Sequence, residues 1–164
     1  MEHNVKGKHI GDNARVSGKA RVSDNALVSD NARVSGKARV SDNALVSGNA
    51  MVFGEALVSD NARVSDNARV SGKAWVSGNA MVFGEARVSG KAQIYGIMRS
   101  DGHCFTYLPC ADGYWRVIAG CRYFTMAEAR EHWLATRGGT PLGAETMVIL
   151  DCLEKLRAVK PDGV

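Results

Sequence analysis

Residues 14–38 read ARVSGKARVSDNALVSDNARVSGKA, and this stretch decides the fold because its residues recur every six positions. Valine returns at Val16, Val22 and Val28, and alanine follows four residues after each. In every Ala-x-Val segment the two apolar side chains lie two positions apart, so in an extended chain both point to the same side. The intervening Gly-Lys and Asp-Asn pairs have the composition of tight turns. The stretch therefore predicts short strands separated by turns.

The turns carry a second period of eighteen residues. Lysine follows glycine at Lys19, Lys37, Lys73 and Lys91, and Glu55 occupies the missing position of that series. The other two turns carry mostly asparagine at the same spacing. Turn identity thus repeats every three hexads, which predicts a triangular coil of three short strands, with coils about 4.8 Å apart. Glu55 is expected to pair with the lysines above and below it, at little gain in stability because the pairs are exposed.

From Ile10 to Ile94 the aliphatic position recurs without a slip, and fourteen complete hexads cover residues 10–93. The pattern aliphatic-x-x-x-small-x resembles that of the hexapeptide-repeat superfamily, and IGDNAR at residues 10–15 is close to the consensus of that family. The resemblance implies a left-handed parallel β-helix. We therefore expect a mainly β fold, a triangular prism of about four to five coils with an interior of Val and Ala columns.

The limits of the hexad pattern divide the chain into three segments. We expect residues 1–9 to be an N-terminal lead-in, residues 10–97 the β-helix, and residues 98–164 a small α+β module. The module begins with a hairpin about the Asp101-Gly102 turn, continues with a further strand and ends with two helices. Its expected task is to cover the open end of the β-helix or to assemble an oligomer.

The two helices have recognisable starts and faces. Thr125 with Glu128 predicts a capping box, and Met126, Ala129 and Trp133 fall on one face of the first helix. For the second helix the expected buried face consists of Val148 or Ile149, Cys152, Leu153 and Leu156. Residues 120–133, GCRYFTMAEAREHW, resemble a tail of uncharacterised hexapeptide-repeat proteins encoded by phages and prophages.

The residue between Ala and Val points outward, and on one side of the prism it is repeatedly apolar. Exposed apolar stripes usually mark an interaction surface, and hexapeptide-repeat proteins are typically homotrimers packed through their prism sides. We therefore predict a homotrimer. The predicted interface consists of Leu27, Leu45, Met81 and Phe83, with Met51 and Phe53 beside them. The alternative is a monomer with scattered surface apolar residues.

Two features suggest anion binding. Arg15, Arg33, Arg69 and Arg87 form one outward column, which is either an anion-binding ladder or a solvated face partly neutralised by the turn acids Asp12, Asp30 and Asp66. The second feature is a loop in front of the second helix, which is either an anion site at a helix N-terminus or a plain loop and cap. The loop consists of Arg137, Gly138, Gly139 and Thr140.

Catalytic features are missing from the coils. The resemblance implies acyltransferases, whose catalytic histidine usually lies near a loop that interrupts the coils. Residues 10–97 contain no interrupting loop, and no histidine lies between His9 and His103. The C-terminal candidates for a Cys–His nucleophile pair or a zinc site lack metal-ligand spacing. They are His103, Cys104, Cys110, Cys121 and His132. We expect neither a metal nor a cofactor.

The preferred hypothesis is a non-catalytic, homotrimeric scaffold or binding protein of phage or prophage origin, with itself or a host protein as partner. One alternative is a binder of a small, nucleotide-like anion at subunit clefts, and another is an acyltransferase using His103 or His132. A net charge of +4 and the lack of a visible aromatic–basic platform do not favour nucleic acid. No apolar run could span a membrane, and we expect a cytoplasmic protein (in the host cytoplasm if phage-encoded) with free cysteines.

Overall fold

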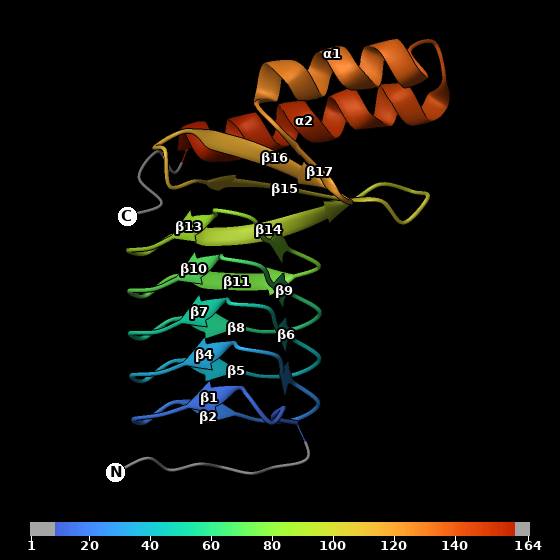
Figure 1. Cartoon of the computed structure of the whole chain (residues 1–164). Coiled ribbons are helices and arrows are strands. Elements are labelled where there is room, and N and C mark those ends of the chain that lie inside the picture. The colour runs from blue at the N-terminus through green and yellow to red at the C-terminus, as the bar shows by residue number, and fades with distance from the viewer. Residues whose placement is uncertain (1–8, 160–164) are drawn as a thin grey trace.

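The structure is a computed structural model of the 164-residue chain, and it describes residues 9–159. A parallel β-solenoid of about five coils occupies the first part of the chain, and a module of strands and helices stands on its last coil (Figure 1). The mainly β, parallel-coil prediction is confirmed. The predicted lead-in, residues 1–9, lies outside the described residues except for His9.

The solenoid strands stack into three faces. The first face contains β1 (Arg15–Val16), β4 (Arg33–Val34), β7 (Met51–Val52), β10 (Arg69–Val70) and β13 (Arg87–Val88). The second face contains β2 (Arg21–Val22), β5 (Arg39–Val40), β8 (Leu57–Val58), β11 (Trp75–Gly78) and β14 (Gln93–Met98). The third face contains β3 (Leu27–Val28), β6 (Leu45–Val46), β9 (Arg63–Val64) and β12 (Met81–Val82).

Each residue of a strand is paired with the residue eighteen positions ahead, as between Arg15 and Arg33 or Leu27 and Leu45. This register confirms the eighteen-residue coil. It stacks Val on Val and Ala on Ala, and these side chains form one core in which all interior positions from Ala26 to Val88 are at most 1% exposed. Each buried valine contributes about 1.5–3 kcal/mol. The interior is therefore a packed core.

The backbone conformation at the corners of the coils explains why the first corner residue is either Gly or Asp. The first corner residue has a positive φ, for example +67° at Gly72 and +57° at Asp66. Glycine adopts this conformation freely, and aspartate tolerates it when its carboxylate binds nearby backbone. Here the carboxylate reaches the next coil: the backbone N–H of Gly84 donates to Oδ2 of Asp66 at 3.2 Å.

At each corner, the side chain of the residue after Gly or Asp stacks on the side chain of the equivalent residue in the next coil. The amide nitrogen of Asn31 donates to the amide oxygen of Asn49 at 3.4 Å, and Asn49 donates in the same way to Asn67. At the glycine corners Glu55 pairs with Lys37 at 3.0 Å and with Lys73 at 3.9 Å, as predicted. The hydrogen bond from Lys37 and the charge of both lysines lower the pKa of the Glu55 carboxyl.

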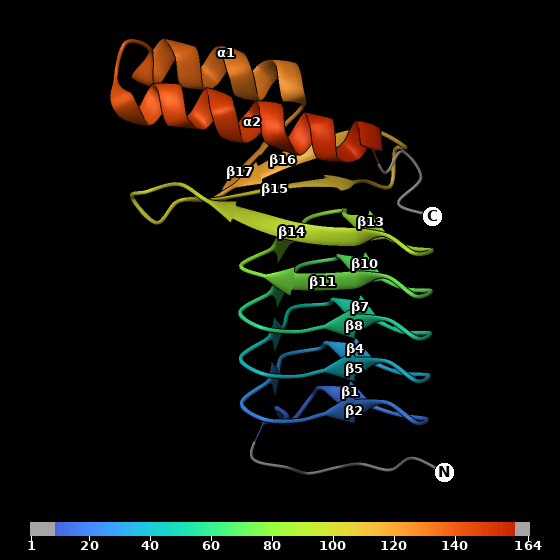
Figure 2. The same cartoon turned by 180° about the vertical axis from the view of Figure 1, so that it is seen from behind.

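Beyond the last coil, the second face continues as an antiparallel meander. Strand β14 pairs with β11 in the coil and with β15 (Cys104–Pro109), which is followed by β16 (Trp115–Ala119) and β17 (Arg122–Phe124). Helices α1 (Met126–Arg137) and α2 (Pro141–Val159) lie on the side of the meander that faces away from the coils (Figures 1 and 2). One sheet thus runs from the first coil into the module.

Side chains of β15 alternate between two cores. Leu108 belongs to the core of the solenoid, whereas Phe105 and Tyr107 belong to a second core with Trp133 of α1 and Leu150 of α2. This is the two-residue period of a strand buried on both sides. The module, below called the cap, therefore shares its central strand with the solenoid interior.

The predicted buried face is observed in α1 and only partly in α2. The capping box of Thr125 and Glu128 is present, and Ala129 and Trp133 are buried. In α2, Ile149 and Leu153 are buried as expected, but Cys152 and Leu156 are exposed. The buried stripe of α2 instead includes Gly143 and Thr146, because the first turns of this helix pack against a polar hairpin described below.

A matched pair of glycine substitutions tests the corner geometry. In Gly72→Ala the new Cβ would lie 2.8 Å from the backbone nitrogen of Gly90, whereas in Gly78→Ala it would meet nothing within 4 Å. Both positions have a positive φ, so both variants carry about 1–2 kcal/mol of backbone strain. We expect Gly72→Ala to lower the thermal unfolding midpoint clearly more than Gly78→Ala. Equal midpoints in circular-dichroism melts would contradict this close coil-to-coil stacking.

Candidate functional site

The cap closes the last coil of the solenoid through bonds to two of its corners and to the third face. The hydroxyl of Thr106 accepts from the backbone N–H of Met81 at 3.0 Å, and the Cys104 thiol donates to the carbonyl of Asn79 at 2.9 Å. The backbone N–H of Ala111 donates to the carbonyl of Glu85 at 3.1 Å. Leu108, Cys110 and Ile118 cover the end of the interior columns, so the expectation that the module covers the open end is confirmed for this structure.

A buried arginine joins the cap hairpin to the helices. Arg99 is 2% exposed, and its Nε and Nη2 atoms donate to the two carboxylate oxygens of Asp101 at 2.8 and 2.7 Å. Its Nη1 donates to the hydroxyl of Thr146 in α2 at 2.9 Å. The guanidinium carbon lies 5.5 Å from the ring centre of Phe105 and 5.2 Å from that of Trp133. Arg99 thus contacts the hairpin, the meander and both helices.

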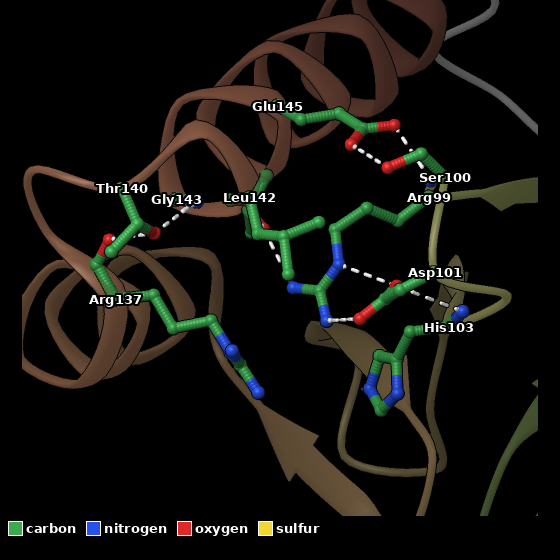
Figure 3. A network of polar contacts seen from close by, with 10 residues as sticks. Arg99, Ser100, Asp101, His103, Arg137, Thr140, Leu142, Gly143 and Glu145 are labelled. Atoms are coloured by element: carbon green, nitrogen blue, oxygen red, sulfur yellow. Dashed lines mark hydrogen bonds and ion pairs between the residues drawn. The ribbon is translucent and has the colours of Figure 1, made fainter.

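The polar groups around Arg99 are satisfied in turn. Thr146 donates its hydroxyl hydrogen to the carbonyl of Leu142. Next to Arg99, the backbone N–H and the hydroxyl of Ser100 donate to the two carboxylate oxygens of Glu145 at 2.7 and 2.6 Å (Figure 3). The hydrogen-bonded guanidinium holds the pKa of Asp101 below its usual range. Buried charges require such partners, and this network orients α2 on the meander.

Sequence reasoning missed Arg99, Thr146 and Glu145. The Asp101-Gly102 turn was identified, but Arg99 and Thr146 lie 47 positions apart and no spacing connects them. The available signal was the combination of an arginine directly after an apolar strand and a threonine on the apolar side of a helix. Both residue types need partners when they are buried.

Replacing Arg99 tests whether this network holds the helices. In Arg99→Met the long apolar stem remains while Asp101 and Thr146 lose their donor. Loss of a charged hydrogen-bond partner costs about 1.5–3 kcal/mol, so amide protection in α1 and α2 should fall about tenfold or more. The matched control is Arg130→Met, which removes exposed pairs to Asp151 and Glu154. Equal protection in the two variants by hydrogen exchange would contradict the role of Arg99.

The two candidate histidines pack against aromatic rings of the cap. His103 lies against Phe105 and Trp133 at ring-centre distances of 5.3 and 5.6 Å, and His132 lies 4.9 Å from Trp133. Burial, with the nearby charge of Arg99, lowers the pKa of His103. The Nε2 of His103 is buried and has no hydrogen-bond partner within residues 9–159. An imidazole held in this way is a packing residue of the cap.

Within residues 9–159, the hydrogen bonds of the cysteine thiols go to groups other than the histidines. All four are free, Cys104 and Cys110 are buried, and Cys121 and Cys152 are exposed. Burial raises the pKa of the Cys104 and Cys110 thiols, and Cys110 accepts a hydrogen bond from the Tyr123 hydroxyl. Within the described part of the chain, no three His, Cys, Asp or Glu residues are grouped so that they could hold a metal ion.

The lowered pKa of His103 predicts a pH-dependent cap. Below the ordinary value of 6.5 the unfolded chain binds a proton that the folded cap resists, so the stability contributed by neutral His103 is present above that pH and is lost as the pH falls toward its folded pKa. The groups that act on it are Arg99, Asp101, Arg137 and the carbonyl of Ala119. Urea unfolding of the helices at about pH 7.5 and about pH 5.5 should show this decline.

The variants separate His103 from the other titrating groups. His103→Gln should lose most of the decline between these two pH values, whereas His132→Gln should keep it. The same decline in wild type and His103→Gln would show that another group is responsible.

The loop predicted to bind anions is built as a helix connection. The Thr140 hydroxyl accepts from the backbone N–H of Gly143 at 3.1 Å and donates to the carbonyl of Arg137 at 2.7 Å (Figure 3). The N–H of Gly138 bonds to Leu134 at the end of α1, and Gly139 has a φ of +76°. These bonds account for the loop without a ligand, and anion binding there stays a prediction.

The predicted trimer residues occupy adjacent coils on the outside of the prism. Leu27 is 41% exposed and is paired in register with the half-buried Leu45. Arg63 separates Leu45 from Met81 on the third face. Met81 and Phe83 pack partly against the core, and the Phe83 ring lies 6.4 Å from the ring of Tyr123. Met51 and Phe53 are half buried on the first face. The trimer itself stays a prediction.

The arginine column is present as a ladder of exposed side chains. Arg15 is paired in register with Arg33, and Arg69 with Arg87, with Met51 between the two pairs. No ion pair joins these arginines to Asp12, Asp30 or Asp66 within residues 9–159. Asp30 and Asp66 instead accept hydrogen bonds from the backbone of the next coil.

Neither α1 nor α2 is long and apolar enough to cross a membrane, and these are the helices between residues 9 and 159.

Comparison with known protein families finds one repeat family. The family model described as the YdcK beta solenoid repeat matches residues 20–36, 27–42, 38–54, 56–72, 62–78 and 74–90. No curated protein and no solved structure matches the chain. The matched segments all lie within the coils and are each close to one coil long. With the three parallel faces, they make the chain a repeat β-solenoid protein that carries an α+β cap.

Proposed function

We propose that this chain is a non-catalytic, homotrimeric scaffold of the hexapeptide-repeat type. The observation that carries the proposal is the unbroken stack of coils, whose interior is filled by Val and Ala and whose last coil is closed by the cap. Such a stack leaves the outer faces for interactions. The packing of His103 and His132 among aromatic rings supports a non-catalytic role.

The third face supports the trimer. Its outward residues are Leu27, Leu45, Arg63 and Met81, so it carries one charge, whereas the first face carries four arginines in the same positions. The least charged side of a protein is the least costly to desolvate. Packing three third faces together would leave the basic first and second faces at the outside.

The proposal includes a cytoplasmic location and a phage or prophage origin. Four free cysteines suit a reducing compartment. The resemblance of residues 120–133 to tails of phage-encoded proteins supports the origin.

Native mass spectrometry tests the assembly. The wild-type chain should give a mass three times its 17.6 kDa, and Leu27→Asp/Leu45→Asp should give the single-chain mass with an unchanged circular-dichroism spectrum. The two carboxylates would be buried in the interface, where charges are costly to desolvate, and Leu27→Asp has no cation opposite it on the neighbouring strand. The matched control is Leu57→Asp, a half-exposed leucine on the second face, which should remain trimeric.

Three results would contradict the proposal. A monomeric wild type, or a trimer that survives both aspartates, would remove the third face as an interface. Acetyl transfer from acetyl-CoA to any acceptor by the wild-type protein would contradict the proposal that the protein is non-catalytic.

A further inference from the structure

Positive charge is concentrated along one edge of the prism. Residues 14–23 and 32–41 have the same sequence, ARVSGKARVS, and the register stacks one on the other. Each copy contributes an arginine on the first face, a lysine at the corner and an arginine on the second face. These six exposed residues are the basic edge: Arg15, Lys19, Arg21, Arg33, Lys37 and Arg39. Adjacent coils lie about 4.8 Å apart, so six charges fall within roughly 10 Å along the prism.

The carboxylates of the solenoid lie mainly at the two other corners. Asp24, Asp42 and Asp60 follow the second face, and Asp30 and Asp66 follow the third. Oδ2 of Asp30 is bound by the Gly48 N–H of the coil above, and Oδ2 of Asp24 lies 2.9 Å from the Ser23 hydroxyl. Within the described residues, Glu55 is the sole acidic partner of the basic edge, through Lys37.

The net charge of +4 therefore hides a strong separation of charge. Like charges directly opposite each other on neighbouring strands are destabilising, and here Arg15 faces Arg33 while Arg21 faces Arg39. A hydrophobic or neutral residue would avoid this repulsion, as Met51 and Leu57 do one coil higher. A polyanion bound along this edge would relieve the repulsion by neutralising both arginine columns.

The second face adds an aromatic surface beside the same edge. Above Arg39, its outward column continues with Leu57 and Trp75, and Trp75 is 43% exposed. The indole N–H of Trp75 donates to the Ser59 hydroxyl at 3.4 Å, which orients the ring along the face. The corner column continues with Glu55, with Lys73 in the coil of Trp75 and with Lys91 one coil higher. The turns that form this corner, between β1 and β2, β4 and β5 and onward, lie at the left edge of the solenoid in Figure 1. Cations next to an exposed aromatic ring are the combination that binds unpaired bases and their phosphates.

The shape of the edge selects an extended partner. A prism corner is convex, whereas small ligands are held in concave pockets. The charges are repeated from coil to coil, and arginine forks suit phosphate oxygens. Contrary to the expectation from the sequence, the register places cations and Trp75 in one column. We propose that the basic edge and the Leu57–Trp75 column bind single-stranded nucleic acid, with phosphates along the edge and bases against Trp75. The basic edge is the corner opposite the third face, and Leu57 and Trp75 lie on the second face, so none of these residues belongs to the third-face interface proposed above.

Fluorescence anisotropy with a labelled oligothymidylate of about 15 nucleotides tests the proposal at low and moderate salt. Wild type should bind, with affinity falling steeply as salt rises. Arg15→Glu/Arg33→Glu and Arg21→Glu/Arg39→Glu should each weaken binding about tenfold or more, because phosphate contacts are replaced by repulsion. Trp75→Ala should weaken it at least about fivefold through loss of stacking.

Two control variants make the same kinds of change, a double charge reversal and the loss of an aromatic ring, outside the basic edge. Arg122→Glu/Lys155→Glu changes the net charge equally but affects exposed cations of β17 and α2, and it should stay within about twofold of wild type. Tyr114→Ala removes an aromatic ring that is 67% exposed in the cap. Circular dichroism and native mass of each variant show whether fold and assembly persist, which separates a failure here from a failure of the trimer.

Four outcomes would overturn the proposal. They are no binding by wild type at low salt, equal weakening by the control and edge variants, no effect of Trp75→Ala, and binding of a matched duplex or a sulfated polysaccharide as tight as that of the single strand. The last outcome would assign the edge to a different polyanion.

Discussion

Every coil of the solenoid depends on backbone hydrogen bonds to the coil beside it. The N–H of Arg15 donates to the carbonyl of Ala32 at 2.9 Å, and the same bond recurs up the prism to Trp75 and Ala92 at 2.7 Å. A solenoid strand is mostly two residues long and has no stability of its own. A slip of one residue in this register would turn the outward arginines into the interior. The Val columns, the Asn ladders and the stacked glycine corners therefore all require the same eighteen-residue register.

Because each coil depends on its neighbour, the last coil needs hydrogen-bond partners from outside the solenoid, and the cap supplies them. A terminal coil has no neighbour, and an exposed strand edge promotes unwanted pairing. Strand β15 supplies partners to Met81 and Asn79, and Leu108 closes the interior. The cap is in turn fastened by Arg99, which takes its partners from the hairpin and from α2. The stability of the solenoid end and the orientation of the helices are thus connected through one short hairpin.

The regular register also determines how the surface is organised. Because each outward position is repeated at intervals of one coil, residues of one kind form straight columns, and each corner keeps its own charge. Glycine and lysine at one corner and aspartate and asparagine at the others separate cations from carboxylates. Leucine replaces arginine at Leu27 and Leu45 on the third face, and Met51 and Leu57 replace it on the first and second faces. Interaction surfaces of such a protein are set by the few positions at which the repeat changes.

The coil, its three faces and the pairing of Glu55 with two lysines were predictable from the sequence, as were the capping box at Thr125 and the buried face of α1. These features arise from contacts between residues at fixed spacings, six or eighteen positions in the solenoid and three or four in a helix. Arg99 and Thr146 have no such fixed spacing. The predicted buried face of α2 was wrong at Cys152 and Leu156 for the same reason, because the way this helix packs depends on contacts with the distant hairpin. In a solenoid each coil contacts only its neighbours, so a periodic sequence by itself determines the stack. The way the hairpin, meander and helices close over the last coil was decided only by the tertiary structure, because it depends on where a buried charge finds its partners.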